Sequence, residues 1–292
     1  MRNVFKLLAL QLLVFTSTLT GQSGPAPATC SIAVSSRPLT TDVRETSGLV
    51  RGRTARDVWW THNDSGNPPM LFAIGADGSV KARIRVEQVR FLDWEDIEAG
   101  ACGNANCLYL ADIGDNAGQR SHVSIYEVVE PAISASTVRP TRTITARYSD
   151  GPQDAEAMFR LPSGELYIVT KGRQKSIKLY RLTAGGTDGQ GTLQLVRELA
   201  PQPRSQLDRV TAATASPDGK WVAIRSYAKL FVYATTDLLN NGAAALTFSL
   251  APLKEKQGES VALENDGTVW LTSEAERKRD VPTMASLRCS LP

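Results

Sequence analysis

The sequence predicts an all-β fold, a five-bladed β-propeller closed by an N-terminal strand, with a six-bladed propeller as the alternative. Two observations support this prediction. A short apolar segment recurs five times, beginning at positions 45, 95, 156, 211 and 259, so that the copies are spaced by 50, 61, 55 and 48 residues. In the last four copies a glycine follows eight positions later, namely Gly103, Gly164, Gly219 and Gly267. This period accommodates four strands and their loops.

Short runs rich in β-branched and aromatic residues follow each glycine turn, as expected for strands. Second strands are expected at 58–60, 108–110, 166–168, 221–223 and 269–271. Third strands are expected at 71–74, 125–128, 179–182 and 230–233, and weaker fourth strands at 80–86, 141–148, 193–199 and 246–250. A β-sandwich also has strands at such spacing, but five aligned copies favour the propeller.

The last repeat is short, with strands expected only at 260–263, 269–272 and 286–289. Residues 29–35 precede the first repeat and have no blade of their own. We therefore expect them to supply the outer strand of the last blade and remove its open edge. This arrangement predicts a disulfide between Cys30 and Cys289, and Cys102 and Cys107 flank a tight turn and can pair locally. Two other pairings of the four cysteines remain arithmetically possible.

The N-terminus has Arg2 and Lys6 before the apolar run 7–15, which is typical of a secretory signal peptide. We expect a signal peptide at 1–22, a flexible lead-in at 23–28 and one domain at 29–292. Four cysteines fit an oxidising compartment, so the protein is expected to be secreted or periplasmic. Without Arg2 and Lys6 the chain has 31 basic and 30 acidic residues, which argues against nucleic-acid binding. No membrane insertion after signal removal is expected, and we expect a monomer.

The first strand of each blade should start at the end where the second strand stops, because the two strands are antiparallel. The first strand begins with an acidic residue in four repeats, and the residues at the end of the second strand are also polar. These side chains should meet at one mouth of the central channel and form a ligand-binding ring of Glu45, Asn63, Glu95, Glu156, Lys171, Arg225, Glu259 and Glu274.

Converging carboxylates repel one another unless a cation compensates them. One interpretation is a Ca²⁺ ion held by oxygen atoms from Glu45, Glu95, Glu156, Glu259, Asn63 and Asp112. The alternative is that each glutamate binds backbone amides of the next blade, and that Lys171 and Arg225 supply the compensating charge.

Four strings, at 63–66, 93–97, 112–116 with Arg120, and 154–157, resemble a largely uncharacterised family of secreted bacterial propeller proteins. The resemblance covers roughly residues 45–181. The rest of the chain shares only the repeat pattern with that family. That family is distantly similar to esterase-like phytases and to propellers of the SMP-30 and strictosidine-synthase type. In gluconolactonase-type relatives an axial Ca²⁺ is held by Glu, Asn and Asp, roles that Glu45, Asn63 and Asp112 would match. The ring of four glutamates and the pair Lys171 and Arg225 depart from that pattern.

Three functions are compatible with the sequence. The first is a propeller that binds a small or extended ligand at the acidic mouth without turnover. The second is a Ca²⁺-dependent hydrolase of esters, lactones or phosphoesters, with His62 or Asp112 as the base. The third is a protein-interaction scaffold with Trp59, Trp60 and Trp94 as anchors. The chain has no Gly-x-Ser-x-Gly elbow, Walker loop, dinucleotide fingerprint or zinc-protease motif.

Overall fold

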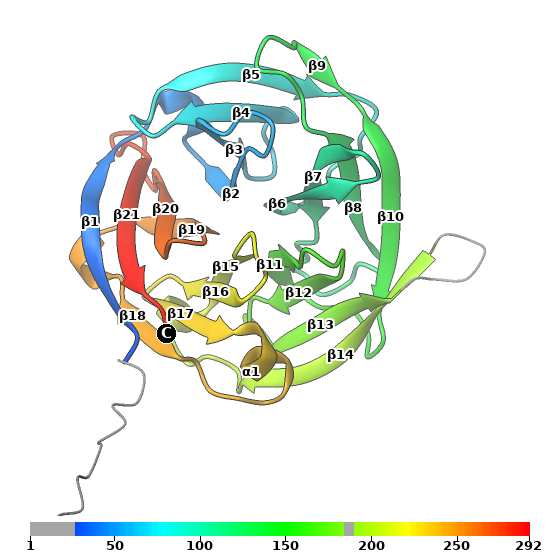
Figure 1. Ribbon diagram of the computed structural model, residues 1–292. Coiled ribbons are helices and arrows are strands. Elements are labelled where there is room, and N and C mark those ends of the chain that lie inside the picture. The colour runs from blue at the N-terminus through cyan, green and yellow to red at the C-terminus, as the bar shows by residue number, and fades with distance from the viewer. Residues whose placement is uncertain (1–26, 184–189) are drawn as a thin grey trace, which may run out of the picture.

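The computed structural model describes residues 27–183 and 190–292, and in these ranges the chain forms a ring of antiparallel sheets (Figure 1). The predicted signal peptide at 1–22 and most of the lead-in at 23–28 lie outside the described residues. Within the described part, no helix has the length and apolar character needed to cross a membrane.

The first half of the ring contains the strands of three successive repeats. The first sheet contains β2 (Thr46–Arg51), β3 (Val58–Asn63), β4 (Met70–Gly75), β5 (Val80–Val86) and the short β9 (Thr137–Val138). The second group contains β6 (Trp94–Cys102), β7 (Ala105–Asp112), β8 (Val123–Val129) and β10 (Pro140–Tyr148). The third contains β11 (Ala155–Arg160), β12 (Leu166–Thr170), β13 (Ile177–Thr183) and β14 (Gln190–Ala200).

The second half of the ring contains two four-stranded sheets. One consists of β15 (Val210–Ala215), β16 (Trp221–Ser226), β17 (Lys229–Ala234) and β18 (Leu246–Ser249). The other consists of β19 (Gln257–Leu263), β20 (Thr268–Glu274), β21 (Thr283–Ser290) and β1 (Thr29–Pro38). The connections include α1 (Thr235–Leu239) and the 3-10 turns η1 (Thr41–Val43), η2 (Gln206–Asp208) and η3 (Ala251–Leu253).

The first strand of every repeat lies toward the centre of the ring (Figure 1). These inner strands contact one another in the closed order β2, β6, β11, β15, β19 and back to β2. As predicted, the start of each inner strand pairs with the end of the next strand, for example Thr46 with Asn63 and Gln257 with Glu274. Charged groups at the starts of β6 and β19 and just after or at the ends of β3, β12 and β20 act on one another, so these strand ends lie at one end of the central axis.

The N-terminal strand closes the ring as predicted. β1 pairs antiparallel with β21, and Cys30 lies directly opposite Cys289 in this register. The predicted disulfides Cys30–Cys289 and Cys102–Cys107 are both present. The first joins positions 259 residues apart, so it links the two ends of the ring covalently.

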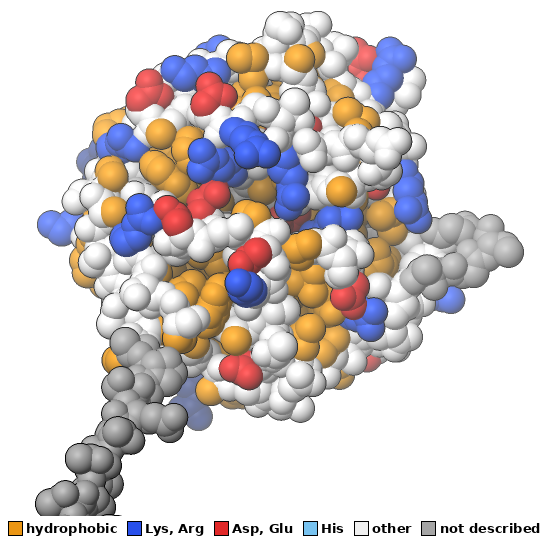
Figure 2. Space-filling model, viewed as in Figure 1, with side chains coloured by type: hydrophobic (Ala, Val, Ile, Leu, Met, Phe, Trp, Pro, Cys, Tyr) orange, Lys and Arg blue, Asp and Glu red, His pale blue; other side chains and the backbone are white. Residues whose placement is uncertain are grey.

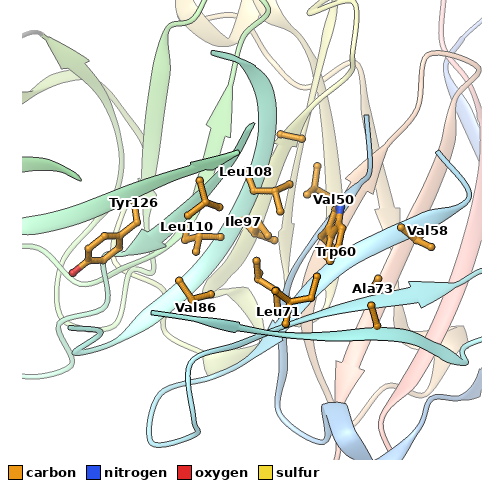
Figure 3. Packing of buried hydrophobic residues seen from close by; sticks show 14 of the residues in the cluster. Val50, Val58, Trp60, Leu71, Ala73, Val86, Ile97, Leu108, Leu110 and Tyr126 are labelled. Carbon is orange, nitrogen blue, oxygen red and sulfur yellow. The ribbon is translucent and has the colours of Figure 1, made fainter. Parts of the chain in front are cut away.

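The core consists of layers between neighbouring sheets. Figure 3 shows one such layer, in which Trp60, Leu71, Ile97 and Leu108 from the first two groups of strands pack together. Between the last and first sheets, the rings of Trp59 and Trp270 lie 4.7 Å apart. The tryptophans that the scaffold hypothesis used as anchors, Trp59, Trp60 and Trp94, are all buried in these layers.

The outer rim contains a pairing that the repeat alone did not predict. β10 and β14 pair in parallel, and this joins the second and third groups of strands into one eight-stranded sheet. β9 likewise adds to β5 in parallel. Figure 2 shows one face of the ring, on which Lys and Arg side chains gather between the centre and the upper rim.

Candidate functional site

Three carboxylates converge at the end of the axis where the inner strands start. One oxygen from each of Asp64, Asp93 and Glu95 lies within 4.8 Å of the others. Asp64 follows the end of β3, and Asp93 and Glu95 stand at the start of β6. We call the carboxyl groups gathered here, Asp64, Asp93, Glu95, Glu259 and Glu274, the acidic end.

β-Bulges occur at the repeated residue of four inner strands. The pairing with the second strand is irregular between Trp94 and Asp96, between Ala155 and Ala157, between Val210 and Ala212, and between Gly258 and Ser260. The residue left between each of these pairs is the repeated one: Glu95, Glu156, Thr211 or Glu259. A bulge redirects its extra residue and interrupts the strand ladder, so the sequence repeat is a repeat of bulges.

Gly114 leaves the space that two of the carboxylates occupy. A Cβ atom at this position would lie 2.3 Å from Glu95 Oε1 and 2.5 Å from Asp93 Oδ2. Any larger residue would displace one of these side chains. The glycine of the string 112–116 is therefore required by the packing of the acidic end.

Burial raises the pKa values throughout the acidic end. The pKa of Glu274 rises to about 9, mainly through burial and also through the negative charges of Glu259 and Asp64. Burial raises the pKa of Glu259 to about 7 and that of Asp64 to about 6, and it holds the pKa of Glu95 well above its ordinary value. These groups therefore compete for protons near neutral pH.

Lys171 is the basic side chain within this group. Its ammonium donates to Glu156, and both side chains are buried. It also lowers the pKa values of Glu95, Glu259 and Glu274. Glu259 accepts further hydrogen bonds from the Tyr227 hydroxyl at 3.1 Å and the Gln257 amide at 2.7 Å.

Two residues predicted for the ring, Glu45 and Asn63, lie beside the acidic end, where the charge of Glu45 raises the pKa values of Asp64 and Glu274. Asn63 accepts a hydrogen bond from the backbone N–H of Glu45 and donates one to the backbone oxygen of Asp42. Glu45 is exposed and accepts a hydrogen bond from the Asn67 amide. The bulge of β2 lies farther along that strand, between Ser47 and Val50, so Glu45 is not re-aimed as the other glutamates are.

Asp112 and His62, the proposed bases, are engaged in the fold. Asp112 accepts hydrogen bonds from Arg120 at 2.9 Å and from the backbone N–H of Asp93 at 2.8 Å. His62 is fully buried and lies edge-on to Trp94, and burial holds its pKa well below the ordinary value. Asp112 is occupied by these contacts, whereas the Nε2 atom of His62 has no hydrogen-bond partner among the described residues but is buried away from solvent.

Arg225 makes its direct contacts within the fold, although its charge also lowers the pKa of Glu259. It is fully buried, lies 2.7 Å from Glu255 and donates to the backbone oxygen of Ser260 at 3.0 Å. Gly258 provides the space, because a Cβ there would lie 1.8 Å from the guanidinium. Arg225 thus ties β16 to β19.

Sequence reasoning did not select Asp64 and Asp93, although both lie inside quoted strings. They stand next to the chosen residues Asn63 and Glu95. Both come from loops, where a period of two does not show which side chain points inward. The signal that could have found them is the density of acidic residues directly beside the strand starts.

Comparison with known proteins provides evidence about the fold only. No family model matches the chain, and no curated protein matches it. Among solved structures, the PQQ-bound form of aldose sugar dehydrogenase from Streptomyces coelicolor aligns with a TM-score of 0.52 and 10% identity, over 92% of this chain and 100% of that one. Hydrazine synthase from Kuenenia stuttgartiensis aligns with a TM-score of 0.43 and 10% identity, over 82% of this chain and 70% of that one.

The chain has a propeller-like fold. The ring of inner strands and the full-length structural match agree on this point. Because identity to the matched structure is only 10%, the match indicates nothing about chemistry, and the function must be argued from the acidic end itself.

Proposed function

We propose that this protein is a secreted or periplasmic five-bladed propeller that binds a cationic ligand at the acidic end, with Ca²⁺ as the first candidate. The convergence of Asp64, Asp93 and Glu95 carries this proposal. The closed contact order of five inner strands supports the blade number, and two disulfides support an oxidising compartment.

The donor set suits a calcium ion. Ca²⁺ binds carboxylate oxygens at about 2.3–2.6 Å, so two ligands on opposite sides of one ion lie about 5 Å apart. Three oxygens within 4.8 Å of one another can therefore share an ion. Glu259 and Glu274 add two further carboxyl groups nearby, because Glu259 acts on Glu95, and Asp64 and Glu259 act on Glu274.

The charge balance also favours a cation. Five carboxyl groups at the acidic end face the buried ammonium of Lys171, which already binds Glu156. Arg225 and Arg120 also act on Glu259 and Asp93, but each is paired with another carboxylate, Glu255 or Asp112. Protons lower the cost of burying these groups, because burial raises all three pKa values and neighbouring carboxylates raise those of Glu274 and Asp64 further. A cation would replace those protons and lower the cost of burying the charges. The hydrolase and scaffold alternatives lack such support, since His62 and the three tryptophans are buried.

Thermal unfolding with and without Ca²⁺ tests the proposal. After chelation, adding Ca²⁺ to about 100 times its Kd should stabilise the protein by about 2.7 kcal/mol and raise Tm by about 5–10 °C. Asp93→Asn should abolish most of this shift. Asp237→Asn, an exposed position on α1, is the matched control and should retain it.

Parallel titrations with Mg²⁺, Mn²⁺ and spermidine identify the kind of cation. A rise in Tm with spermidine alone would show that the ligand is an organic cation and not a metal ion. No shift with any of these cations would refute cation binding at the acidic end.

A further inference from the structure

A second feature lies at the other end of the central axis, where the inner strands stop. A cavity of about 470 Å³ opens there between the ends of β2, β6, β15 and β19. Its lining includes three arginines and two glutamates, of which Glu98 is buried. We call it the arginine cavity and define it by Arg51, Arg53, Arg56, Glu98, Thr214 and Glu264. Its volume falls within the range of small-molecule sites.

The basic charge of this cavity is only partly compensated. Arg51 lies 3.6 Å from Glu264, and its Nε donates to the backbone oxygen of Arg56. The guanidinium groups of Arg53 and Arg56 have no hydrogen bond or ion pair with any side chain in the described ranges. Arginine forks bind carboxylate and phosphate groups in a bidentate manner, so the two are suited to an anion.

The buried side chain of Glu130 holds the backbone of the loop that carries Arg53 and Arg56. Glu130 accepts hydrogen bonds from the backbone N–H groups of Arg53, Thr54 and Ala55 at 2.8–3.2 Å. It also accepts one from the Trp60 indole at 3.1 Å. A single buried carboxylate therefore fixes the backbone between β2 and β3, and less ordering is required when a ligand binds.

Glu98 lines the cavity from β6 with an unused polar atom. Its side chain interacts with Thr214, but its Oε1 is buried and has no hydrogen-bond partner. Burial and the negative charge of Asp96 raise the pKa of Glu98 well above its ordinary value, which favours its neutral, protonated form. A neutral acid can both donate and accept a hydrogen bond, as a ligand hydroxyl requires.

We propose that the arginine cavity binds a small anion that also carries hydroxyl groups. Arg53 and Arg56 hold the anionic group, and Glu98 and Thr214 bind the hydroxyl groups. A sugar phosphate and a sugar acid share this chemistry. The proposal is independent of the acidic end, because it uses different residues at the opposite end of the axis.

Isothermal titration calorimetry of the whole protein tests this proposal with four probes: glucose 6-phosphate, glucuronate, inorganic phosphate and glucose. We expect at least one of the two sugar anions to bind with a Kd of about 1 mM or tighter at low salt. The preferred anion then distinguishes a phosphate from a carboxylate ligand. Glucose should bind at least about tenfold more weakly, because it offers no charge to the arginines.

Variants assign the binding to this cavity. Replacing both arginines, Arg53→Gln with Arg56→Gln, should weaken binding at least about tenfold, since two charge-assisted contacts are lost. Arg85→Gln on the outer strand β5 removes one exposed charge elsewhere and should leave the Kd unchanged. Undiminished binding by the double variant, or no binding of either sugar anion to the native protein, overturns the proposal. Inorganic phosphate binding as tightly as glucose 6-phosphate overturns the role given to Glu98.

Discussion

Lys171 donates to the carboxylate of Glu156, and the two side chains are buried together beside the acidic end. The ammonium also stabilises the charged forms of Glu95 and Glu259, whose pKa values it lowers. One lysine thus compensates several carboxylates. Its position at the end of β12 follows from the antiparallel pairing of β11 and β12.

Removing this lysine should destabilise the cation-free protein. Lys171→Met leaves Glu156 buried without its partner, and breaking a buried pair in this way typically costs about 3–5 kcal/mol. Lys229→Met is the matched control, because Lys229 and Asp208 form a half-exposed pair whose loss should cost about 1 kcal/mol or less. Urea unfolding in the presence of a chelator measures both. Equal losses in the two variants would show that Lys171 contributes no more than a surface residue.

The stability of the cation-free protein should fall as the pH rises. Glu274 and Glu259 have pKa values of about 9 and about 7 in the folded protein, above the ordinary value of 4.5. The folded state therefore binds more protons than the unfolded state, and the contribution is complete below pH 4.5 and is lost as the pH passes through 7 and 9. Each such proton changes the free energy of unfolding by about 1.4 kcal/mol per pH unit.

Urea unfolding at about pH 5, 7 and 9 with a chelator measures this slope. Glu274→Gln cannot titrate and should give a shallower slope. Burial also raises the pKa of Glu95, so part of the pH dependence of stability should remain in that variant. A slope unchanged by Glu274→Gln would mean that this carboxyl is ionised in the folded protein.

Affinity for Ca²⁺ should show the opposite dependence on pH. Binding requires the carboxylates to release their protons, so Kd should decrease between pH 6 and pH 9, the range in which Asp64, Glu259 and Glu274 titrate. Calorimetry in buffers of different ionisation enthalpy measures the protons released. A Kd independent of pH would place the ion away from these groups.

The sequence predicted the fold well because the repeat reflects local rules. The turn glycines, the strand-type runs and the unpaired segment at 29–35 each act over a few residues, and Cys30 and Cys289 followed from the topology. The parallel pairing of β10 with β14 was not predictable. It depends on how two outer strands from neighbouring repeats meet at the rim.

The sequence predicted where acidic side chains gather but only some of the residues that gather there. Glu95, Glu156 and Glu259 stand at bulges, which recur with the repeat. Asp64 and Asp93 come from loops, and nothing in the strand period shows which way they point. Arg225 was expected in the ring but is held by Glu255, a residue from a connection outside the repeat.

The two disulfides should contribute very differently to stability. Cys30 and Cys289 are separated by 259 residues, and Cys102 and Cys107 by 5. In the chain-entropy model, closing these loops stabilises the folded state by about 5.6 and about 2 kcal/mol respectively. Cys30→Ala with Cys289→Ala should therefore lower the free energy of unfolding more than Cys102→Ala with Cys107→Ala, as measured by urea unfolding under non-reducing conditions. The first pair also joins β1 to β21, so its loss should expose the backbone of β21 at the edge of its sheet to hydrogen exchange. If the local pair proved the more stabilising, the ring would be closed by strand pairing and packing alone.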